Sequence, residues 1–534
     1  MSHLAGSGVG TKFGAGGMER VHPASDTVFK LRFHRDKSND LAFEAAGKVA
    51  VAGDDVALNF AGRRHVVGWR NGAGFVVRTM CRNTVPLYVR SRLGEVWISN
   101  DVAELTVPGE TLAIRAVEVF SAVKSPSAIK SVAAHLLDDI TLLLPASLYE
   151  VSLNGAGNVQ CVWKDVVFQE QPNSRDELLE FVVERYREAF SGYDEVCLAL
   201  SGGYDSRFEL AILAHLNKTV HCFHYERLGR ERRLASRAAR ACGASFHAVP
   251  VSEAARTGWQ LLHDRGYTTR WDGYFSAGTI PSAGVYAEME RLRPSAAKQL
   301  LVTGTLRGRL YDKADQIFAH WHKVEQDSLA RLELAFPEFR QTIHAERERR
   351  HQTFIELENK IRAKTDRTDV MTDISYHFHY KSVGKVATRT TFLVENGMPI
   401  LIADQTVRDR FAALPVAEKN DEAFLRWAIG KLQPRLARLP WVTSSDRTLG
   451  RQFGIAARWP IARALLSRYR VPDIGDLTDW ISEAESDSIL QQLPELRRLV
   501  AQARPGNSGL YVSMILQFLS TLQARKKVSY RLSS

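Results

Sequence analysis

Residues 196–207 join an apolar run to a short glycine-rich segment, and this pairing is the strongest chemical signal in the chain. Small residues at 201–203 let backbone N–H groups converge on one anion. A helix expected from 208 directs the positive end of its dipole at the same point. Asp205 adds a hard oxygen ligand for a phosphate-bound Mg²⁺, and Ser206 adds a hydroxyl donor. The segment predicts a phosphate site, and a plain glycine turn between strand and helix is the simpler alternative.

The sequence from about residue 175 alternates strand patterns with helix patterns, which favours a parallel α/β sheet. Such sheets bind ligands at the carboxyl ends of their strands, where the glycine-rich segment is expected to lie. Helices dominate the later part of the chain. The expected strands are 195–200, 219–224, 245–251 and 300–304, and the expected helices are 177–190, 207–216, 231–242, 313–334, 338–364, 424–436 and 494–503.

Residues 28–167 show a different pattern, in which short alternating apolar runs are separated by glycine, asparagine and aspartate turns. This pattern predicts a β-rich first domain. Two helical intervals, 113–122 and 129–137, interrupt it. The expected strands lie at 49–52, 66–69, 75–78, 87–90, 96–99 and 147–152.

Length and composition indicate a globular protein of more than one domain. The chain has 534 residues, of which 45% are hydrophobic and 25% charged, which fits neither one ordinary core nor global disorder. We expect a flexible lead over 1–25, the β-rich domain over 26–168 and an α/β domain over 170–534.

Targeting signals and cysteine usage suggest a soluble, cytoplasmic protein. No run approaches the roughly 18 apolar residues of a membrane span, and the first residues lack the apolar core of a signal peptide. We therefore expect no membrane partner. The five cysteines are scattered without a Cys-x-x-Cys pair, which favours buried free thiols over disulfides or zinc.

The formal net charge of +11 indicates an anionic partner or simply a soluble surface. Basic residues concentrate at 227–240, 347–350 and 525–527. Glutamates are interleaved with the first two groups, which is typical of solvated helix faces. Nucleic acid is accordingly the less favoured partner, and no recognisable RNA-binding module is present in the sequence.

The run Ser-Gly-Gly-Tyr-Asp-Ser at 201–206 resembles the pyrophosphate loop of the ATP pyrophosphatase superfamily, whose members cleave ATP between the α and β phosphates. Later segments follow the order of asparagine synthetases. Residues 224–243 are similar to the strand, loop and helix after that loop, 302–311 to a second glycine loop, and 397–434 to later helical segments. The resemblance covers about residues 180–440 and implies an adenine nucleotide hydrolase-like parallel sheet with a helical extension.

The first domain extends the resemblance to the asparagine synthetase-like family. Residues 85–105 are similar to a strand pair of the family's N-terminal amidohydrolase-like sandwich, and 144–148 to a turn near its end, although any β meander is an alternative. A glutaminase of this family needs a cysteine at the mature amino terminus, where the α-amine serves as base. The first cysteine here is Cys81. We expect a degenerate glutaminase-like domain without glutamine hydrolysis, similar to β-lactam synthetases and lasso-peptide cyclases.

The resemblance assigns ATP and Mg²⁺ as cofactors and gives the site residues their roles. Backbone amides of 201–206 would hold pyrophosphate, Asp205 would hold Mg²⁺, and Leu200 and Gly304 would flank adenine. Separately from the resemblance, Lys381, Lys385 and Arg389 lie in a segment rich in cations, and we expect one of them to contact phosphates or the developing oxyanion. Surface cations on a helix are an equal alternative. The implied nucleotide-binding set is Leu200, Ser201, Gly202, Gly203, Tyr204, Asp205, Ser206 and Gly304, and the implied catalytic set is Asp205, Arg307, Lys381 and Lys385.

The chain departs from the family pattern at three places. The second glycine loop carries Arg307 and Arg309 and no acidic residue. Two alternatives follow: one of these arginines replaces a metal contact, or the site binds nucleotide without turnover. The late lysine of relatives is not evident, since Pro440-Trp-Val-Thr-Ser-Ser-Asp is found there. Asp404 lies two positions beyond the expected aspartate.

The expected activity is ATP-dependent amide-bond formation, in which a carboxylate is adenylated and an amine or ammonia then displaces AMP. The carboxylate substrate is a small molecule or a peptide, and a homodimer is compatible with this reading. Residues 270–284 suit a pocket for a polar substrate or, equally, an ordinary packed loop. Three alternatives stay open: a lasso-type macrolactam cyclase, a tRNA-modifying adenylating enzyme and a non-catalytic nucleotide-binding scaffold.

Overall fold

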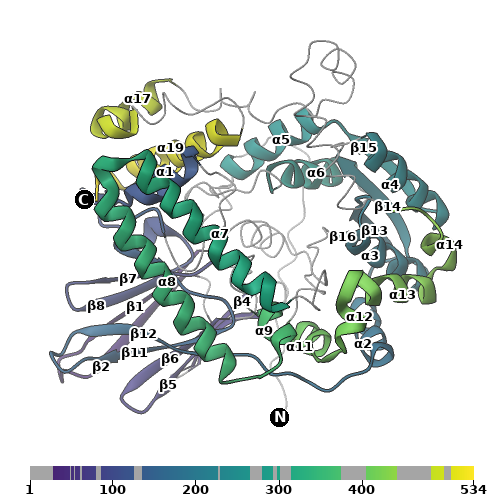
Figure 1. Cartoon of the computed structure of the whole chain (residues 1–534), viewed down its shortest axis with the longest axis horizontal. Helices are drawn as coiled ribbons and strands as arrows, with labels where there is room; N and C mark the ends of the chain where they lie inside the picture. The colour runs from purple at the N-terminus through teal and green to yellow at the C-terminus, as the bar shows by residue number, and fades with distance from the viewer. Residues whose placement is uncertain are drawn as a thin grey trace, which may run out of the picture.

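The computed structural model of the chain is a mixed α/β structure with several sheets (Figure 1). Among the described residues, two sheets are antiparallel, one four-stranded sheet is parallel, and one sheet has two strands. The expectation of mixed α/β architecture is confirmed at this level. The structure describes residues 28–47, 50–52, 55–60, 63–79, 86–124, 135–225, 229–264, 279–292, 298–300, 314–374, 405–441, 483–497 and 507–533.

The two antiparallel sheets are built from the N-terminal region, in the orders β10-β7-β8-β1-β2 and β12-β11-β6-β5-β4-β3. Alternate residues of β1 are buried, and the Phe33 ring lies 5.2 Å from Phe75 of the other sheet, so the sheets face each other. Each of the six strands expected here is present. Together the two sheets consist of β1 (Phe29–Arg35), β2 (Leu41–Gly47), β3 (Ala50–Ala52), β4 (Asp55–Phe60), β5 (Arg63–Asn71), β6 (Gly74–Thr79), β7 (Tyr88–Arg92), β8 (Glu95–Ser99), β10 (Ile140–Leu142), β11 (Ser147–Leu153) and β12 (Val159–Val166).

The two helices expected in this region are only partly correct. Residues Thr111–Ile114 form strand β9, and helix α1 covers Ala116–Lys124. Strand β9 pairs in parallel with β17 (Ser529–Leu532), a partner that no local pattern could indicate. Of the interval 129–137, residues 129–134 lie outside the described part. Leu137 bridges to Ile114 and is not helical, so the expected helix is wrong at its end.

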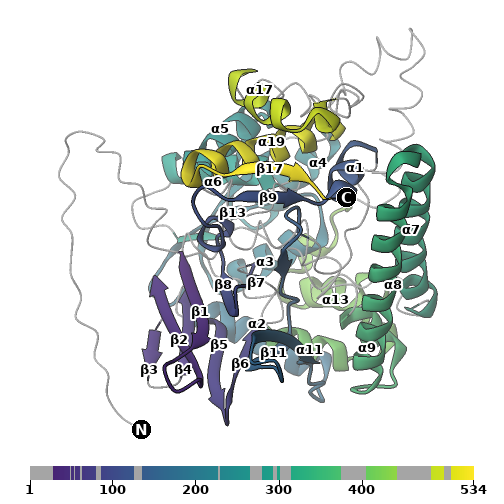
Figure 2. The ribbon, with the colours of Figure 1, turned by 90° about the vertical axis from the view of Figure 1, so that its left-hand side faces the viewer.

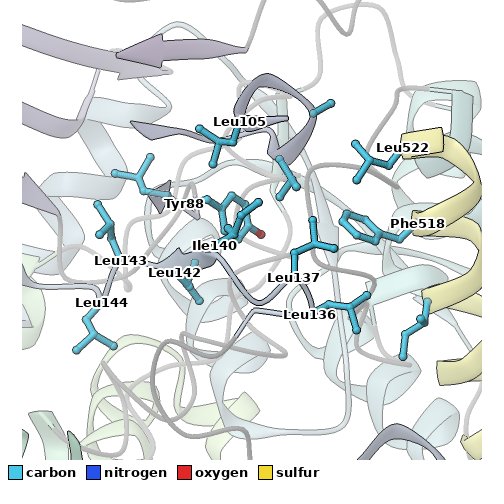
Figure 3. Packing of buried hydrophobic residues seen from close by; sticks show 14 of the residues in the cluster. Tyr88, Leu105, Leu136, Leu137, Ile140, Leu142, Leu143, Leu144, Phe518 and Leu522 are labelled. Carbon is cyan, nitrogen blue, oxygen red and sulfur yellow. The ribbon is translucent and has the colours of Figure 1, made fainter. Parts of the chain in front are cut away.

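The last described residues return to the N-terminal region. Helix α19 (Asn507–Lys526) and β17 lie beside β9 (Figure 2). Phe518 of α19 points into the same apolar cluster as Tyr88 and Leu137, with its ring 6.0 Å from that of His135 (Figure 3). This packing buries apolar side chains from segments about 400 residues apart in one core.

The parallel sheet consists of β13 (Glu195–Ala199), β14 (Thr219–Tyr225), β15 (Ser245–Val249) and β16 (Lys298–Leu300), in the order β15-β14-β13-β16. The chain moves outward from β13 through β14 to β15 and then returns to pair β16 with the other side of β13. The strand order therefore reverses between β13 and β16. In open α/β sheets the crevice at such a switch point is where ligands bind.

Helices cover both faces of this sheet. Val196 and Leu198 of β13 belong to one apolar cluster with α2 (Arg175–Ala189), α3 (Tyr204–His215), α4 (Gly229–Ala241) and α13 (Ala423–Leu432). Cys197, on the opposite face, belongs to the cluster that includes α5 (Val251–Asp264) and α6 (Thr279–Leu292) (Figure 1). The alternation along β13 thus separates two layers of helices.

Helices α5 and α6 are packed backbone against backbone. A Cβ added at Gly258 would lie 1.9 Å from Ile280 O, and one at Gly284 would lie 1.7 Å from Ala254 O. Only glycine fits these two positions. Residues 279–284 are therefore part of a tightly packed helix, so the expectation of an ordinary loop is wrong for that part of 270–284. Residues 270–278 lie outside the described part.

A long helical hairpin, α7 (Ala314–Ala335) and α8 (Arg340–Arg362), confirms two expected helices and joins the N-terminal region through buried charges. Arg350 pairs with Glu118 of α1, with Glu325 at 3.2 Å and with Glu346 at 2.7 Å. Burial opposes ionisation of Glu346, but hydrogen bonds from Arg349 and the charge of Arg350 lower its pKa to about 2. The expected solvated face at 347–350 is thus wrong for Arg350.

Proline ends one expected helix early. The interval 424–436 is two helices, α13 and α14 (Pro434–Ala437), because Pro434 lacks the N–H that would continue α13. Of 494–503, residues 494–497 are helical and the rest lie outside the described part. Further helices are α9 (Thr368–Thr372), α11 (Gln405–Ala413), α12 (Val416–Lys419) and α17 (Glu483–Gln492).

The described cysteines carry free thiols, as expected. Cys197 and Cys222 are buried, and Cys161 and Cys242 are half-buried. Burial raises the pKa of Cys242 to about 11 and that of Cys161 to about 12, so neither is a reactive thiolate at neutral pH. Among the helices that the structure describes, none has the length and apolar character needed to span a bilayer.

Candidate functional site

The candidate site begins where β13 ends, at the switch point of the parallel sheet. Leu200 continues the strand by one residue, because its N–H donates to Phe223 O at 2.8 Å. Its own carbonyl accepts a hydrogen bond from Nδ1 of the buried His224 at 2.9 Å. Leu200 is itself buried. Leu200, at the start of the loop, is therefore bonded to β14 through both its N–H and its C=O.

Two serines close the loop at residues 201–206. The Ser201 N–H donates to Ser206 Oγ at 3.0 Å, and the Ser206 hydroxyl donates back to Ser201 O at 3.2 Å. The two hydroxyl oxygens lie 2.9 Å apart, and Ser201 Oγ also accepts from the Gly203 N–H at 3.2 Å. Two of the amides expected to hold pyrophosphate, those of Ser201 and Gly203, thus donate within the loop. The loop is fixed in shape by its own side chains.

Helix α3 begins at Tyr204, before the start at 207 or 208 that the sequence suggested. Gly203 adopts the extended N-cap conformation, with φ −86° and ψ 175°, and supplies no side-chain cap. Asp205 and Ser206 therefore lie in the first helical turn rather than in a loop. The N–H groups of a first turn have no intrahelical acceptor, so they are suited to an anion.

Glycine at position 203 is not required by the protein's own backbone. Its φ is negative, and a Cβ there would meet nothing closer than Ser201 Oγ, at an ordinary 3.4 Å. The backbone conformation at this position is therefore open to residues other than glycine. A methyl group at 203 would instead occupy space next to the first turn of α3.

An aromatic and cationic stack holds residues 439–441 against α3. The Tyr204 and Trp441 rings are stacked with centroids 3.9 Å apart, and the Arg207 guanidinium lies 4.4 Å from the Trp441 ring. Arg207 also donates to Leu439 O at 3.3 Å and to Pro440 O at 2.7 Å. Burial lowers the pKa of Arg207 to about 10, so it remains charged at neutral pH.

Sequence reasoning missed this stack. Trp441 was notable only because an expected lysine is absent from its neighbourhood, and nothing in the spacing places it next to residue 204. The aromatic residue at the variable position of the motif, Tyr204, was the one local signal for a stacking partner.

Asp205 provides the carboxylate of the candidate site and is half-buried in the first turn of α3. Within the described ranges, no group of three or more histidine, cysteine or acidic side chains forms a metal site. A single carboxylate nevertheless fits Mg²⁺ that arrives with a nucleotide, because such Mg²⁺ takes one or two carboxylates and otherwise phosphate and water oxygens.

The structure brings together the first part of the expected site and leaves the rest untested. Leu200, Gly202 and the loop up to Ser206 lie together at the carboxyl end of β13. The other expected site residues lie outside the described residues, and so do the three further residues noted in the sequence. These are Gly304, Arg307, Lys381 and Lys385, with Arg309, Arg389 and Asp404.

No family model matches the sequence, and a search of curated proteins finds no match to it.

Proposed function

We propose that this protein is an ATP-dependent ligase that adenylates a substrate carboxylate and transfers the acyl group to an amine or to ammonia. The observation that carries the proposal is the Ser-Gly-Gly-Tyr-Asp-Ser segment, which joins β13 to the first turn of α3 at the switch point of a parallel sheet. The order β15-β14-β13-β16 also supports the finer proposal of an adenine nucleotide hydrolase-like domain.

The loop has three properties that suit a polyphosphate. Its conformation is fixed in advance by the Ser201 and Ser206 hydrogen bonds, so binding would cost little reorganisation. The first turn of α3 is uncapped and points its dipole toward the loop. Gly203 leaves space that the fold itself does not need. Together these features favour a close approach of phosphate oxygens to the backbone.

The proposed reaction has two steps. A carboxylate oxygen of the substrate bonds to the α phosphorus of ATP while the bond to the β-phosphate oxygen breaks, which releases pyrophosphate. The amine nitrogen then bonds to the acyl carbon, the bond to the AMP oxygen breaks, and the amine loses a proton. Backbone N–H groups of the first turn of α3 would stabilise the charge that develops on the leaving pyrophosphate. Mg²⁺ held by Asp205 and the phosphates would neutralise further charge.

The proposal is tested by following AMP and pyrophosphate from ATP with Mg²⁺, a panel of small carboxylates and peptides, and hydroxylamine as a trapping amine. We expect AMP formation that depends on the carboxylate. Asp205→Ala should lower its rate by about 100-fold. Asp194→Ala, at the exposed opposite end of β13, is the matched control and should keep the activity.

Other outcomes favour other functions. ADP and inorganic phosphate as products, or AMP formation that survives Asp205→Ala, would contradict the proposal. Binding of labelled ATP without AMP formation from any carboxylate would favour the nucleotide-binding scaffold. AMP release triggered by tRNA alone would favour a tRNA-modifying enzyme.

A further inference from the structure

A cavity of about 880 Å³ lies at the end of α3 opposite the Ser201–Ser206 loop. It is formed where the C-terminal ends of α3 and α4 meet α14. Four of its lining residues are basic, and none of its lining residues is acidic. The basic residues are Lys218, Arg240, Arg435 and Arg438.

These cations are not needed to cap the two helices. Asn217 (φ 56°) ends α3 in a left-handed conformation, and Gly243 (φ 68°) does the same for α4. In each helix two backbone N–H groups then bond back to the last turn, which satisfies the terminal carbonyls. The bonds are Lys218 N to Leu213 O at 3.0 Å and Asn217 N to Ala214 O at 3.1 Å, and Ala244 N to Ala239 O at 2.9 Å and Gly243 N to Arg240 O at 3.1 Å.

The basic lining continues along α4 outside the cavity. Arg233, Arg237 and Arg240 are spaced i, i+4 and i+7, so they share one face of the helix, and all three are exposed. The opposite face, which includes Ala235 and Ala239, is buried against the sheet. The stripe extends for about 10 Å along the helix axis.

No carboxylate pairs with any of these arginines in the part of the chain that the structure describes. Some other surface arginines are paired, as in Arg187 with Glu184 and Arg362 with Glu358. We call these five arginines, Arg233, Arg237, Arg240, Arg435 and Arg438, together with Lys218, whose ammonium donates to Tyr193 O at 2.7 Å, the arginine groove. Four of these cations line the cavity, and Arg233 and Arg237 continue the charge along α4. Like charges gathered in this way raise the local potential and attract an extended anion.

We propose that the arginine groove binds the phosphate backbone of a nucleic acid. Guanidinium groups bind phosphates in a two-pronged geometry, and five of the six cations are arginines. The stripe is longer than one phosphate group and matches successive phosphates, which rise by about 3.4 Å per nucleotide in a duplex strand. No aromatic residue lines the cavity, so no base would stack there and the binding would not depend on sequence. This proposal does not rest on the ligase chemistry.

The test uses the full chain and fluorescein-labelled single-stranded RNA of about 20 nucleotides, with duplex RNA and duplex DNA as further probes, in fluorescence anisotropy. We expect binding of unrelated sequences with equal affinity. Five phosphate contacts at about 0.7 each give a slope near −3.5 for the logarithm of the binding constant against that of salt concentration.

The double variant Arg435→Gln/Arg438→Gln should weaken binding about tenfold and make the slope about 1.4 less steep. The double variant Arg187→Gln/Arg362→Gln removes the same net charge from paired, exposed arginines and should bind within about twofold of the parent. ATP binding should be unchanged in both. Because all four side chains are exposed, thermal unfolding should also be unchanged.

Three results would overturn the proposal. The first is no binding of any nucleic acid at low salt. The second is equal weakening by the two double variants, which would mean that only net charge matters. The third is displacement of RNA by poly-glutamate of the same charge concentration, which would assign the groove to acidic peptides.

Discussion

The two ends of helix α3 both suit anions, but they obtain their positive potential from different sources. At the N-terminal end the charge belongs to the backbone, because the first turn is uncapped and the loop beside it is fixed by Ser201 and Ser206. At the C-terminal end, backbone N–H groups donate to the carbonyls of the last helical turn, and the positive charge belongs to arginine side chains. Backbone N–H groups are held in fixed positions, so they suit an anion of one size and shape. Long side chains are flexible and adapt to a ligand of variable shape.

Both ends of α3 depend on the same folded core. A substitution that disrupts this core far from both ends should therefore weaken both binding activities together. Gly284→Ala places a Cβ where Ala254 O lies at 1.7 Å, so α5 and α6 must separate. We expect a loss of about 3 kcal/mol in the free energy of unfolding, measured by urea denaturation. Gly192→Ala, at a position with no neighbour within 4 Å, is the control and should change little. Loss of one binding activity with retention of the other would show that the two ends do not depend on the same core.

A smaller effect is expected from Arg207→Met, which acts on the side of α3 between its two ends. The change removes the donor for Leu439 O and Pro440 O and the cation over Trp441. We expect a loss of about 2 kcal/mol in unfolding free energy and a shift in the near-ultraviolet circular dichroism of the tryptophans. Arg237→Met is the exposed control. An unchanged spectrum would mean that Trp441 is not held by this contact.

Glycine-to-alanine substitutions beside the two anion-binding regions should have different functional results. Gly243→Ala, at the C-terminal end of α4 in the arginine groove, forces alanine to φ 68° and should cost about 1 kcal/mol of unfolding free energy. ATP binding should remain unchanged, as measured by titration with a fluorescent ATP analogue. Weakened ATP binding would show that the two ends are coupled through the sheet.

Gly203→Ala should have the smallest effect on stability, about 0.5 kcal/mol, because the backbone and its neighbours accept a Cβ there. ATP affinity should nevertheless fall about tenfold, since the methyl group would lie beside the first turn that faces the phosphates. RNA binding is the internal control and should not change. Retention of full ATP affinity would remove the main support for a phosphate at this loop.

What the sequence predicted well was set by local pattern. The glycine-rich turn after β13, the strands β13 to β15 and the hairpin α7 and α8 all follow from periodicity and turn residues within short windows. The start of α3 was placed too late because a Ser-Gly-Gly-Tyr-Asp-Ser run suggests a loop throughout. Its first turn in fact includes Asp205 and Ser206.

What the sequence could not predict depends on partners far along the chain. The reversal of strand order at β13 requires the place of β16, and the contact of Trp441 with Tyr204 joins residues more than 200 positions apart. Arg350 looked like a solvated charge because its local neighbours are charged. Its burial is decided by Glu118, which comes from another region of the molecule. The arginine groove likewise combines α4 with α14.

The pairing of β9 with β17 has a consequence for synthesis of the protein on the ribosome. Strand β9 is complete at Ile114, but its partner begins at Ser529, so at 5 to 20 residues per second the pairing waits roughly 20 to 80 s. During that time the nascent chain exposes an open strand edge and the apolar residues of α1 that α19 later covers. A chaperone that shields this edge during translation would therefore raise the yield of folded protein, and a truncation before residue 507 would leave the N-terminal region prone to aggregation.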